Sequence, residues 1–440
     1  MKILWLTNIA LPEASILMNE VPSPFGGWLE SASKVLSKEE NIELSISFPG
    51  MKLNNVKKLN GKRIKYYIFP NIQMKDKDLI CDNIDLTNIL IEVQPDLVHI
   101  FGTEFAHSLA MVNVCKKLGI ETVINIQGLV SIIAKHYTAN LPLNIQRKYT
   151  FRDLFKQNNI LQQKKEFEKR GLIEIEAIKK TQHIIGRTTW DYACTKQINP
   201  SANYYFCNET LRGEFYKHKW TLENCERHTI FMSQAAYPIK GLHYMLEALS
   251  ILIRKHPETK LYIAGPDITA SNSIKDKLKK TSYSKYIAEM IKKNNLKDHV
   301  LFMGLLNEKQ MCERYLKSNL FVCPSSIENS PNSLGEAMIL GVPCVASDVG
   351  GVSDMLVNKA EGFVYQADAP YMLAYYISEL FRNDELALNF SENARTHALK
   401  THDYTINTNR LIDIYGDVLR GNMGDLQEDS LKLIKEHSYD

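Results

Sequence analysis

One stretch of the chain combines two glutamates with a helix start, and the helix start could bind an anionic ligand. Glu328 and Glu336 have seven residues between them and lie within the element 320–351. Its apolar run 320–323 predicts a buried strand, and a helix is expected to begin near Ser333. A strand followed by a loop and a helix N-terminus places an anion against backbone N–H groups at the carboxyl edge of a parallel sheet. The alternative is that both acids only stabilise the helix start.

A lysine and two glycines elsewhere suit the same ligand. Lys240 precedes Gly241 at an expected loop-to-helix junction, where an ammonium group can bind phosphate together with the helix dipole. Gly26 and Gly27 follow the first expected strand and let the backbone approach a ligand closely. Taken singly, Lys240 reads as a surface lysine and the glycine pair as an ordinary turn.

Other polar residues are expected at the carboxyl ends of first-half strands. Glu104 and His107 follow the run 97–101, and Gln127 follows 122–126. We expect the first two to face a cleft, whereas Gln127 could bond sugar hydroxyls or only its own loop. His99, inside a strand, is either a core histidine or a site residue.

Arg187 also emerges at a strand end, after the run 183–186. A guanidinium there can contact a phosphate or carboxylate with two hydrogen bonds. The structural alternative is an ion pair with Asp191 or Glu209.

The elements that position these residues alternate between strands and helices, which predicts βαβ units and open parallel sheets. The 440 residues exceed one core, and two or three domains are expected. We expect a first domain at 1–213, a second at 228–400 and a C-terminal helix with a polar tail at 401–440. Expected strands are 3–6, 42–48, 64–69, 97–101, 122–126, 183–186, 203–206, 228–232, 260–264, 300–303, 320–323, 342–346 and 362–365.

The composition limits the class of protein. Apolar residues make up 45% and charged residues 23%, as in a soluble globular protein. We find no run of about 18 apolar residues, the length that could span a bilayer. The N-terminal residues do not resemble a signal peptide. Eight cysteines without C-x-x-C spacing predict free thiols in the cytosol and no metal site. A net charge of +3 is too small to indicate nucleic-acid binding.

Residues 135–170 form an aromatic, basic insertion with nine Lys and Arg against three Asp and Glu. Such a segment could contact an anionic membrane surface or an acceptor. The alternative is a solvated helix with a core-facing stripe.

Together these features resemble glycosyltransferase family 4, the retaining group 1 glycosyl transferases of the GT-B fold. The resemblance is closest over 228–366, where ENSPNSLGEAMILGVPCVASDVGG matches the two-glutamate signature of the family, and it continues more weakly over 1–210. It implies an α/β chain with two Rossmann-like, doubly wound parallel-sheet domains facing a central cleft. It also implies transfer of a sugar from a UDP- or GDP-linked donor to a saccharide or lipid-linked acceptor, without a metal or other cofactor.

The resemblance also implies roles for individual residues. Glu328 bonds the transferring sugar and Lys240 neutralises the phosphates, and we expect both to be catalytic. Glu336 binds the ribose hydroxyls. The remaining donor-site residues are Asn332, Ser333 and Leu334, through backbone N–H groups, with Gly26, Gly27 and Arg187; the acceptor-side residues are Gln127, Glu104 and His107.

Three positions depart from the family pattern. Ala235 stands where an arginine often pairs with the lysine, and Arg187 or Arg212 could replace it. Gln127 stands where many members have a histidine, and Asp354 where a glutamate is common.

The leading hypothesis is therefore a retaining hexosyltransferase that builds surface polysaccharide or glycolipid in the cytoplasm or at the inner membrane face. Alternatives are a catalytically silent nucleotide-sugar-binding subunit, a phosphorylase or an epimerase. An NAD oxidoreductase is disfavoured because no G-x-G-x-x-G follows a strand.

Overall fold

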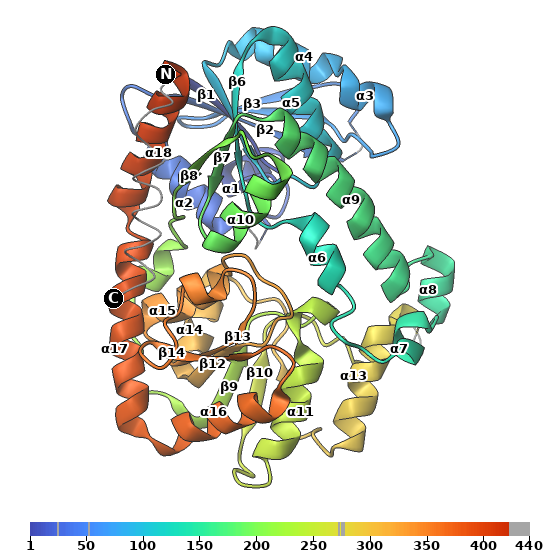
Figure 1. Ribbon diagram of the computed structural model, residues 1–440, viewed down its shortest axis with the longest axis vertical. Coiled ribbons are helices and arrows are strands. Elements are labelled where there is room, and N and C mark those ends of the chain that lie inside the picture. Colours follow the sequence, from blue (N-terminus) through green and yellow to red (C-terminus); the bar gives the residue numbers. More distant parts are fainter. Residues whose placement is uncertain (24–25, 52, 272, 274–277, 422–440) are drawn as a thin grey trace. The chain divides into compact units, whose positions relative to one another are not determined.

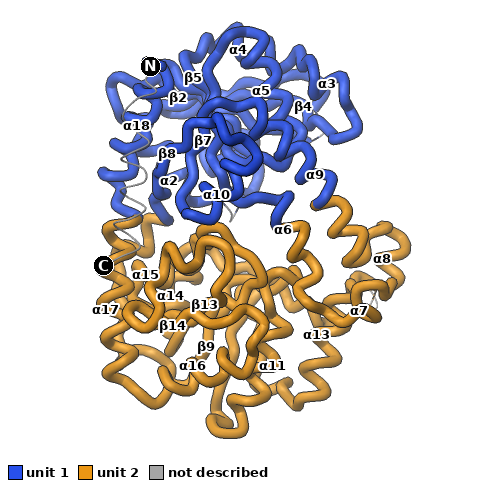
Figure 2. Tube along the Cα trace, in the orientation of Figure 1, with its two compact units in different colours: residues 1–132, 168–211, 402–440 blue, residues 133–167, 212–401 orange. Residues whose placement is uncertain are grey.

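The computed structural model describes residues 1–23, 26–51, 53–271, 273 and 278–421. Its residues divide into two compact units (Figure 2). Unit 1 comprises residues 1–132, 168–211 and 402–440, and unit 2 comprises 133–167 and 212–401. The polar tail expected after Gly421 lies outside the described residues.

Unit 1 is built on an eight-stranded sheet in the order β3-β4-β2-β1-β5-β6-β7-β8. Neighbouring strands are parallel except β3, which pairs antiparallel with β4. The strands are β1 (Lys2–Leu6), β2 (Glu43–Gly50), β3 (Lys57–Asn60), β4 (Lys65–Pro70), β5 (Leu97–Phe101), β6 (Glu121–Asn125), β7 (His183–Gly186) and β8 (Asn203–Phe206). The helices are α1 (Pro12–Leu17), α2 (Gly27–Leu36), α3 (Lys77–Cys81), α4 (Ile84–Val93), α5 (Ala106–Leu118), α6 (Val130–His136), α9 (Ile160–Lys180), α10 (Thr189–Ile198) and α18 (Tyr404–Arg420); α6 and α9 are shared with unit 2.

Helices cover both faces of this sheet. Successive side chains of β1 point to opposite faces and enter two different cores. Leu4 and Leu6 belong to a core formed with α3, α4 and α5, whereas Ile3 and Trp5 belong to a core formed with α2 and α18. Figure 1 shows α2 and α18 along the sheet. Burial on both faces explains why the strands read as continuous apolar runs.

Unit 2 is built on a parallel sheet in the order β11-β10-β9-β12-β13-β14. The strands are β9 (Glu226–Met232), β10 (Lys260–Ile263), β11 (Val300–Phe302), β12 (Ser318–Cys323), β13 (Cys344–Asp348) and β14 (Gly362–Gln366). The helices are α7 (Leu143–Arg147), α8 (Phe151–Lys156), η1 (Gly213–Lys217), η2 (Pro238–Lys240), α11 (Leu242–Leu252), α13 (Ser282–Lys293), α14 (Glu308–Lys317), α15 (Asn332–Leu340), η3 (Val352–Asp354), α16 (Pro370–Arg382) and α17 (Asp384–Thr401). In chain order the strands run 3-2-1-4-5-6, the arrangement of a Rossmann domain.

The predicted fold class, α/β with two Rossmann-like doubly wound sheets, is confirmed. All thirteen predicted strands are present with ends shifted by up to two residues. Strand β3 was not predicted, because KKLN is polar and lies at the sheet edge, where lysines discourage pairing with another chain.

One predicted domain boundary differs from the division of the structure into units. Residues 133–167 were expected in the first domain, but their buried side chains Tyr137, Leu141 and Ile145 pack in the core of unit 2. Helix α9 begins at Ile160, where Asn159 and Gln162 exchange capping hydrogen bonds.

Helix α18 belongs to unit 1, and Ile414, Tyr415 and Val418 lie on its buried face. None of the described helices has the length and apolar character needed to pass through a bilayer.

Candidate functional site

The loops after β9 and β12 meet at the point where the strand order of unit 2 reverses. β9 and β12 are neighbours, and the chain leaves them toward opposite edges of the sheet. In open α/β sheets this switch point leaves a crevice outside the carboxyl ends of the strands, where ligands bind. Lys240 ends η2 in the loop after β9, and Glu328 lies in the loop after β12.

The structure brings these two residues together. Lys240 Nζ donates a hydrogen bond to Glu328 Oε1 at 2.6 Å, and Ser325 Oγ donates to the same oxygen at 2.7 Å. Burial lowers the pKa of the Lys240 ammonium, but the Glu328 carboxylate outweighs this effect and the pKa ends above its ordinary value. The site therefore keeps a charged lysine beside a carboxylate whose one oxygen accepts two hydrogen bonds.

Two glycines allow the loops to approach so closely. Gly241 has φ +71°, and a Cβ there would lie 1.8 Å from the Pro324 carbonyl oxygen. Gly350 has φ +56°, and a Cβ there would lie 1.8 Å from the Glu328 carbonyl oxygen. Any larger residue at either position would displace the backbone on which Lys240 and Glu328 depend.

Glu336, in the second turn of α15, is buried and paired with Arg212. Arg212 Nε donates to Oε1 at 2.6 Å and Nη2 donates to Oε2 at 2.7 Å, so the contact is bidentate. Burial raises the pKa of the Glu336 carboxyl, against the opposing effect of the guanidinium. The guanidinium of Arg212 also lies over the Phe215 ring, 4.7 Å from its centroid. The carboxylate partner of Arg212 is Glu336, whereas that of Lys240 is Glu328.

The start of α15 has the backbone geometry expected of an anion site. Pro331 is the N-cap, and the first turn contains no acidic side chain. The Leu334 N–H is bonded to the Pro331 carbonyl oxygen at 2.9 Å, so it is engaged within the helix. Asn332 and Ser333, which precede it, lie at the first two helical positions, and their N–H groups point toward the N-terminal end.

In unit 1 the predicted glycine pair begins a helix. Gly26 is the N-cap of α2 with φ +76°, and Gly27 is its first residue. A Cβ at Gly26 would lie 2.4 Å from Ile9 Cδ1, so glycine is required both by the backbone angle and by the close side chain.

Glu104 and His107 follow β5 as predicted, in a largely buried environment. His107 Nε2 shares a hydrogen bond with Asn8 Oδ1 at 2.8 Å and stacks on Phe105. Burial lowers the pKa of His107 to about 3, so its imidazole is neutral at pH 7. Burial raises the pKa of Glu104, and Arg170 and backbone N–H groups oppose the shift.

Gln127 and Arg187 belong to one buried network in unit 1. Arg187 Nη1 donates to Glu209 Oε2 at 2.6 Å, which is one of the ion pairs left open by the sequence. Gln127 Nε2 donates to Glu209 Oε1 at 2.7 Å and to Asn125 Oδ1 at 2.6 Å. Gln127 and Arg187 thus share one carboxylate, a relationship that sequence spacing does not reveal.

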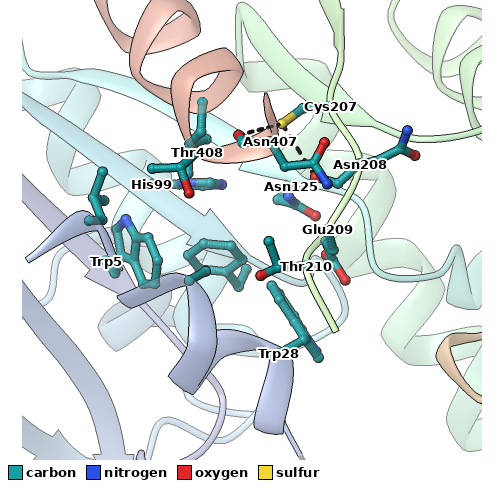
Figure 3. A pocket seen from close by; sticks show the side chains of 14 residues that line it. Trp5, Trp28, His99, Asn125, Cys207, Asn208, Glu209, Thr210, Asn407 and Thr408 are labelled. Atoms are coloured by element: carbon teal, nitrogen blue, oxygen red, sulfur yellow. Dashed lines mark hydrogen bonds between the residues drawn. The ribbon is translucent and has the colours of Figure 1, made fainter. Parts of the chain in front are cut away.

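His99 is a core histidine, the structural reading left open above. The Trp5 indole N–H donates to Tyr415 Oη at 2.9 Å, and His99 Nδ1 lies 2.6 Å from the same oxygen. His99 Nδ1 and the Tyr415 hydroxyl share this hydrogen bond, and the other ring nitrogen of His99 is Nε2. This atom has no hydrogen-bond partner among the described residues. His99 lines a cavity of about 40 Å³ (Figure 3), room for about three water molecules.

The one group that could hold a metal ion in the described part of the chain is His228, His256 and Glu258. His228 Nδ1 lies 2.5 Å from Glu258 Oε1, and the three ligand atoms lie within 4.8 Å of one another. His228 lies near the amino end of β9, and Glu258 precedes β10. The group is therefore at the sheet edge opposite Lys240 and Glu328.

Comparisons with known proteins agree with this geometry. Residues 216–397 match the family model described as glycosyl transferases group 1. The chain is 26% identical over 217 residues to a putative glycosyltransferase, YtcC, of Bacillus subtilis (strain 168), covering 48% of this chain and 51% of that protein. It is 30% identical over 166 residues to the poly(ribitol-phosphate) alpha-N-acetylglucosaminyltransferase of Staphylococcus aureus (strain COL), covering 38% and 30%. The chain thus spans about half or less of the length of these curated relatives.

A solved structure extends the similarity to both units. The Anabaena protein Alr3699/HepE in complex with UDP has a TM-score of 0.65 with this chain at 15% identity, covering 95% of this chain and 100% of that one. At this identity the likeness shows the fold, which is GT-B. The family match over residues 216–397 agrees with the resemblance to group 1 glycosyl transferases that the two glutamates suggested.

Proposed function

We propose that this chain is a retaining glycosyltransferase of family 4. It transfers a hexosyl group from a UDP- or GDP-linked sugar to a saccharide or lipid-linked acceptor, in the synthesis of surface polysaccharide or glycolipid. The observation that carries the proposal is the contact between Lys240 and Glu328 at the switch point of the unit 2 sheet.

The leaving group explains the need for Lys240. When the bond between the sugar and the diphosphate breaks, negative charge develops on the departing phosphate oxygen. Groups that are already oriented toward this charge lower the barrier most, because they need no reorganisation during the reaction. Lys240 supplies a full positive charge and the N-terminus of α15 a partial one. We therefore propose that the reaction requires no metal or other cofactor.

The sugar explains the need for Glu328. Positive charge spreads over the anomeric carbon and ring oxygen as the bond breaks, and a nearby carboxylate favours this state. Glu328 accepts hydrogen bonds from Lys240 and Ser325 through Oε1. Its Oε2 is the oxygen that we assign to a hydroxyl of the transferring sugar.

The nucleotide explains the burial of Glu336. A carboxylate has about four lone-pair positions, and Arg212 occupies two of them. The other two suit the vicinal hydroxyls of ribose. In this proposal Arg212 orients Glu336 and opposes the rise that burial causes in the pKa of its carboxyl.

The relatives support the substrate classes. The Anabaena structure contains UDP, and the name of the Staphylococcus aureus relative gives a polymeric acceptor. We place the reaction in the cytoplasm, where cysteine thiols remain reduced.

A second candidate is a catalytically silent subunit that binds a nucleotide sugar. Two observations favour it: Ala235 stands in the position of the phosphate-binding arginine, and Gln127 is bonded to Glu209 where many relatives have histidine.

The experiment is a turnover assay with UDP- and GDP-linked hexoses and saccharide acceptors, followed by NMR of the product anomer. The proposal predicts release of the nucleoside diphosphate and a product with the donor's anomeric configuration. Inversion contradicts the retaining assignment. Binding of nucleotide without any transfer favours the silent subunit.

A further inference from the structure

Helix α8 presents three large apolar side chains to solvent. Phe151, Leu154 and Phe155 are 67%, 62% and 82% exposed. They stand at positions i, i+3 and i+4, which place them on one face of the helix. Leu143 in α7 and Tyr149 between the two helices are also exposed, at 64% and 46%. We call these five side chains the apolar face.

The opposite side of α8 packs against the rest of unit 2. Asp153, about 200° around the helix from Phe151, is fully buried and accepts a hydrogen bond from the Ser282 N–H at 3.0 Å. Asp153 also forms a capping box with Thr150 at the helix start. Figure 1 shows α7 and α8 beside α13, to which Ser282 belongs. The exposed side chains therefore lie on a helix that is fixed by its opposite face.

The charged side chains that the segment 141–159 itself exposes have one sign. Between residues 141 and 159 the charged side chains are those of Asp153, which is buried, and four basic residues: Arg147, Lys148, Arg152 and Lys156. Lys148 lies 3.6 Å from Glu289, and Arg152 lies 3.4 Å from Asp153. The surface thus combines bulky apolar groups with basic ones and exposes no acid of its own.

We infer that the apolar face of α7 and α8 docks this protein on an anionic lipid bilayer. Phenylalanine and leucine insert at the boundary between headgroups and acyl chains, while lysine and arginine remain among the phosphates. The charges disfavour a second copy of this chain as the occupant, because it would bring four more basic residues to the contact. This inference is independent of the transfer reaction and concerns where the protein binds.

Only part of the aromatic, basic stretch 135–170 is available for such a surface. Tyr137 and Phe167, part of the aromatic pattern in the sequence, pack against each other with ring centroids 4.6 Å apart. Tyr137 is buried in the core of unit 2 and Phe167 is packed against it. The membrane surface is therefore limited to residues 143–156.

The test is sedimentation of the full-length protein with vesicles of phosphatidylcholine, with and without one third phosphatidylglycerol, at low and high salt. We expect binding to the anionic vesicles only, weakened by salt. Replacing Phe151, Leu154 and Phe155 by serine should weaken binding at least about tenfold. The variant Arg147→Gln, Arg152→Gln, Lys156→Gln should weaken it about a hundredfold.

The matched control is the variant Leu305→Ser, Tyr371→Ser, Tyr375→Ser, whose side chains are 72%, 61% and 53% exposed elsewhere on unit 2. It should bind like the wild type, and circular dichroism should show that all variants are folded. Absence of wild-type binding, or equal loss in the control, overturns the inference. So does light scattering that finds a wild-type dimer converted to a monomer by the serine variant, because the face would then join two copies. None of these measurements uses a nucleotide sugar, so their failure leaves the proposed function standing.

Discussion

The guanidinium of Arg212 donates two hydrogen bonds to the carboxylate of Glu336, at 2.6 and 2.7 Å, across 124 residues of sequence. Glu336 is 5% exposed, so this pair is effectively buried. A buried carboxylate that loses its partner is costly, since water cannot replace the lost hydrogen bonds. Arg212 therefore belongs to the candidate site, through its contact with Glu336.

The first prediction concerns this pair. Arg212→Met should lower the free energy of unfolding by about 3 kcal/mol, because it leaves Glu336 without a counter-charge. Arg212→Lys should recover only part of the loss, since lysine cannot form the bidentate contact. Urea denaturation measures both. The double variant Arg212→Met, Glu336→Met should be more stable than Arg212→Met alone; equal stabilities would show that the pair contributes nothing.

The second prediction separates chemistry from binding at Glu328. Glu328→Gln should lower kcat by about two orders of magnitude, because the charge near the anomeric centre is lost. The affinity for the nucleotide should change less than about threefold, since the ribose is assigned to Glu336 and the diphosphate to Lys240 and the start of α15, whereas Glu328 is assigned to the sugar. Glu258→Gln, at the opposite edge of the same sheet, is the control and should retain kcat. Unchanged turnover in Glu328→Gln would reduce Glu328 to a structural partner of Lys240.

The third prediction uses two glycines with the same backbone angle. Gly241 and Gly304 have φ of +71° and +74°, but only at Gly241 would a Cβ meet another atom, 1.8 Å away. Gly304→Ala should therefore cost about 1 kcal/mol of stability from the backbone angle alone. Gly241→Ala should cost about 3 kcal/mol or more and abolish turnover, because it displaces Lys240 from Glu328. Denaturation and turnover that are equal in the two variants would show that the close approach is not needed.

The fourth prediction concerns acid stability in unit 1. Burial lowers the pKa of His99 and that of His107 to about 3, well below the ordinary value near 6.5. The unfolded chain therefore binds more protons than the folded one between these values, and stability falls as the pH decreases from about 6.5 toward 3. Each histidine contributes up to about 1.4 kcal/mol per pH unit.

Urea denaturation of wild type and His99→Gln at pH 7, 6 and 5 measures the His99 contribution. The variant should be less stable at pH 7 because it loses the contact with Tyr415. As the pH decreases, its free energy of unfolding should fall less steeply than that of the wild type, because unfolding of the variant takes up about one proton fewer. Parallel curves would mean that His99 titrates normally in the folded protein.

The sequence predicted the fold well because both sheets are parallel apart from β3 and are covered on both faces. Such strands read as continuous apolar runs, and thirteen of the fourteen were found in this way. The exception, β3, is a polar edge strand that depends on pairing with β4. The assignment of residues 133–167 to unit 2 was missed because it rests on long-range contacts such as that of Asp153 with Ser282.

The candidate site was predicted in part. Glu328 and Lys240 were identified separately, but their direct contact depends on the strand order and on Gly241 and Gly350. Arg212 was considered as a replacement for a phosphate-binding arginine, whereas the structure pairs it with Glu336. Spacing along the chain carries no signal for either pairing, since each joins residues far apart in sequence.

If the proposed function is right, unit 2 binds a nucleotide sugar through Glu336. The most direct measurement is thermal unfolding of the wild type with UDP, GDP, ADP and CMP, beside Glu336→Ala and the surface control Glu313→Ala. At a concentration one hundred times Kd, a bound nucleotide stabilises by about 2.7 kcal/mol, which raises Tm by about 5 °C or more. We expect this rise with UDP or GDP for the wild type and Glu313→Ala, and its loss in Glu336→Ala. No rise with any of the four nucleotides would contradict it.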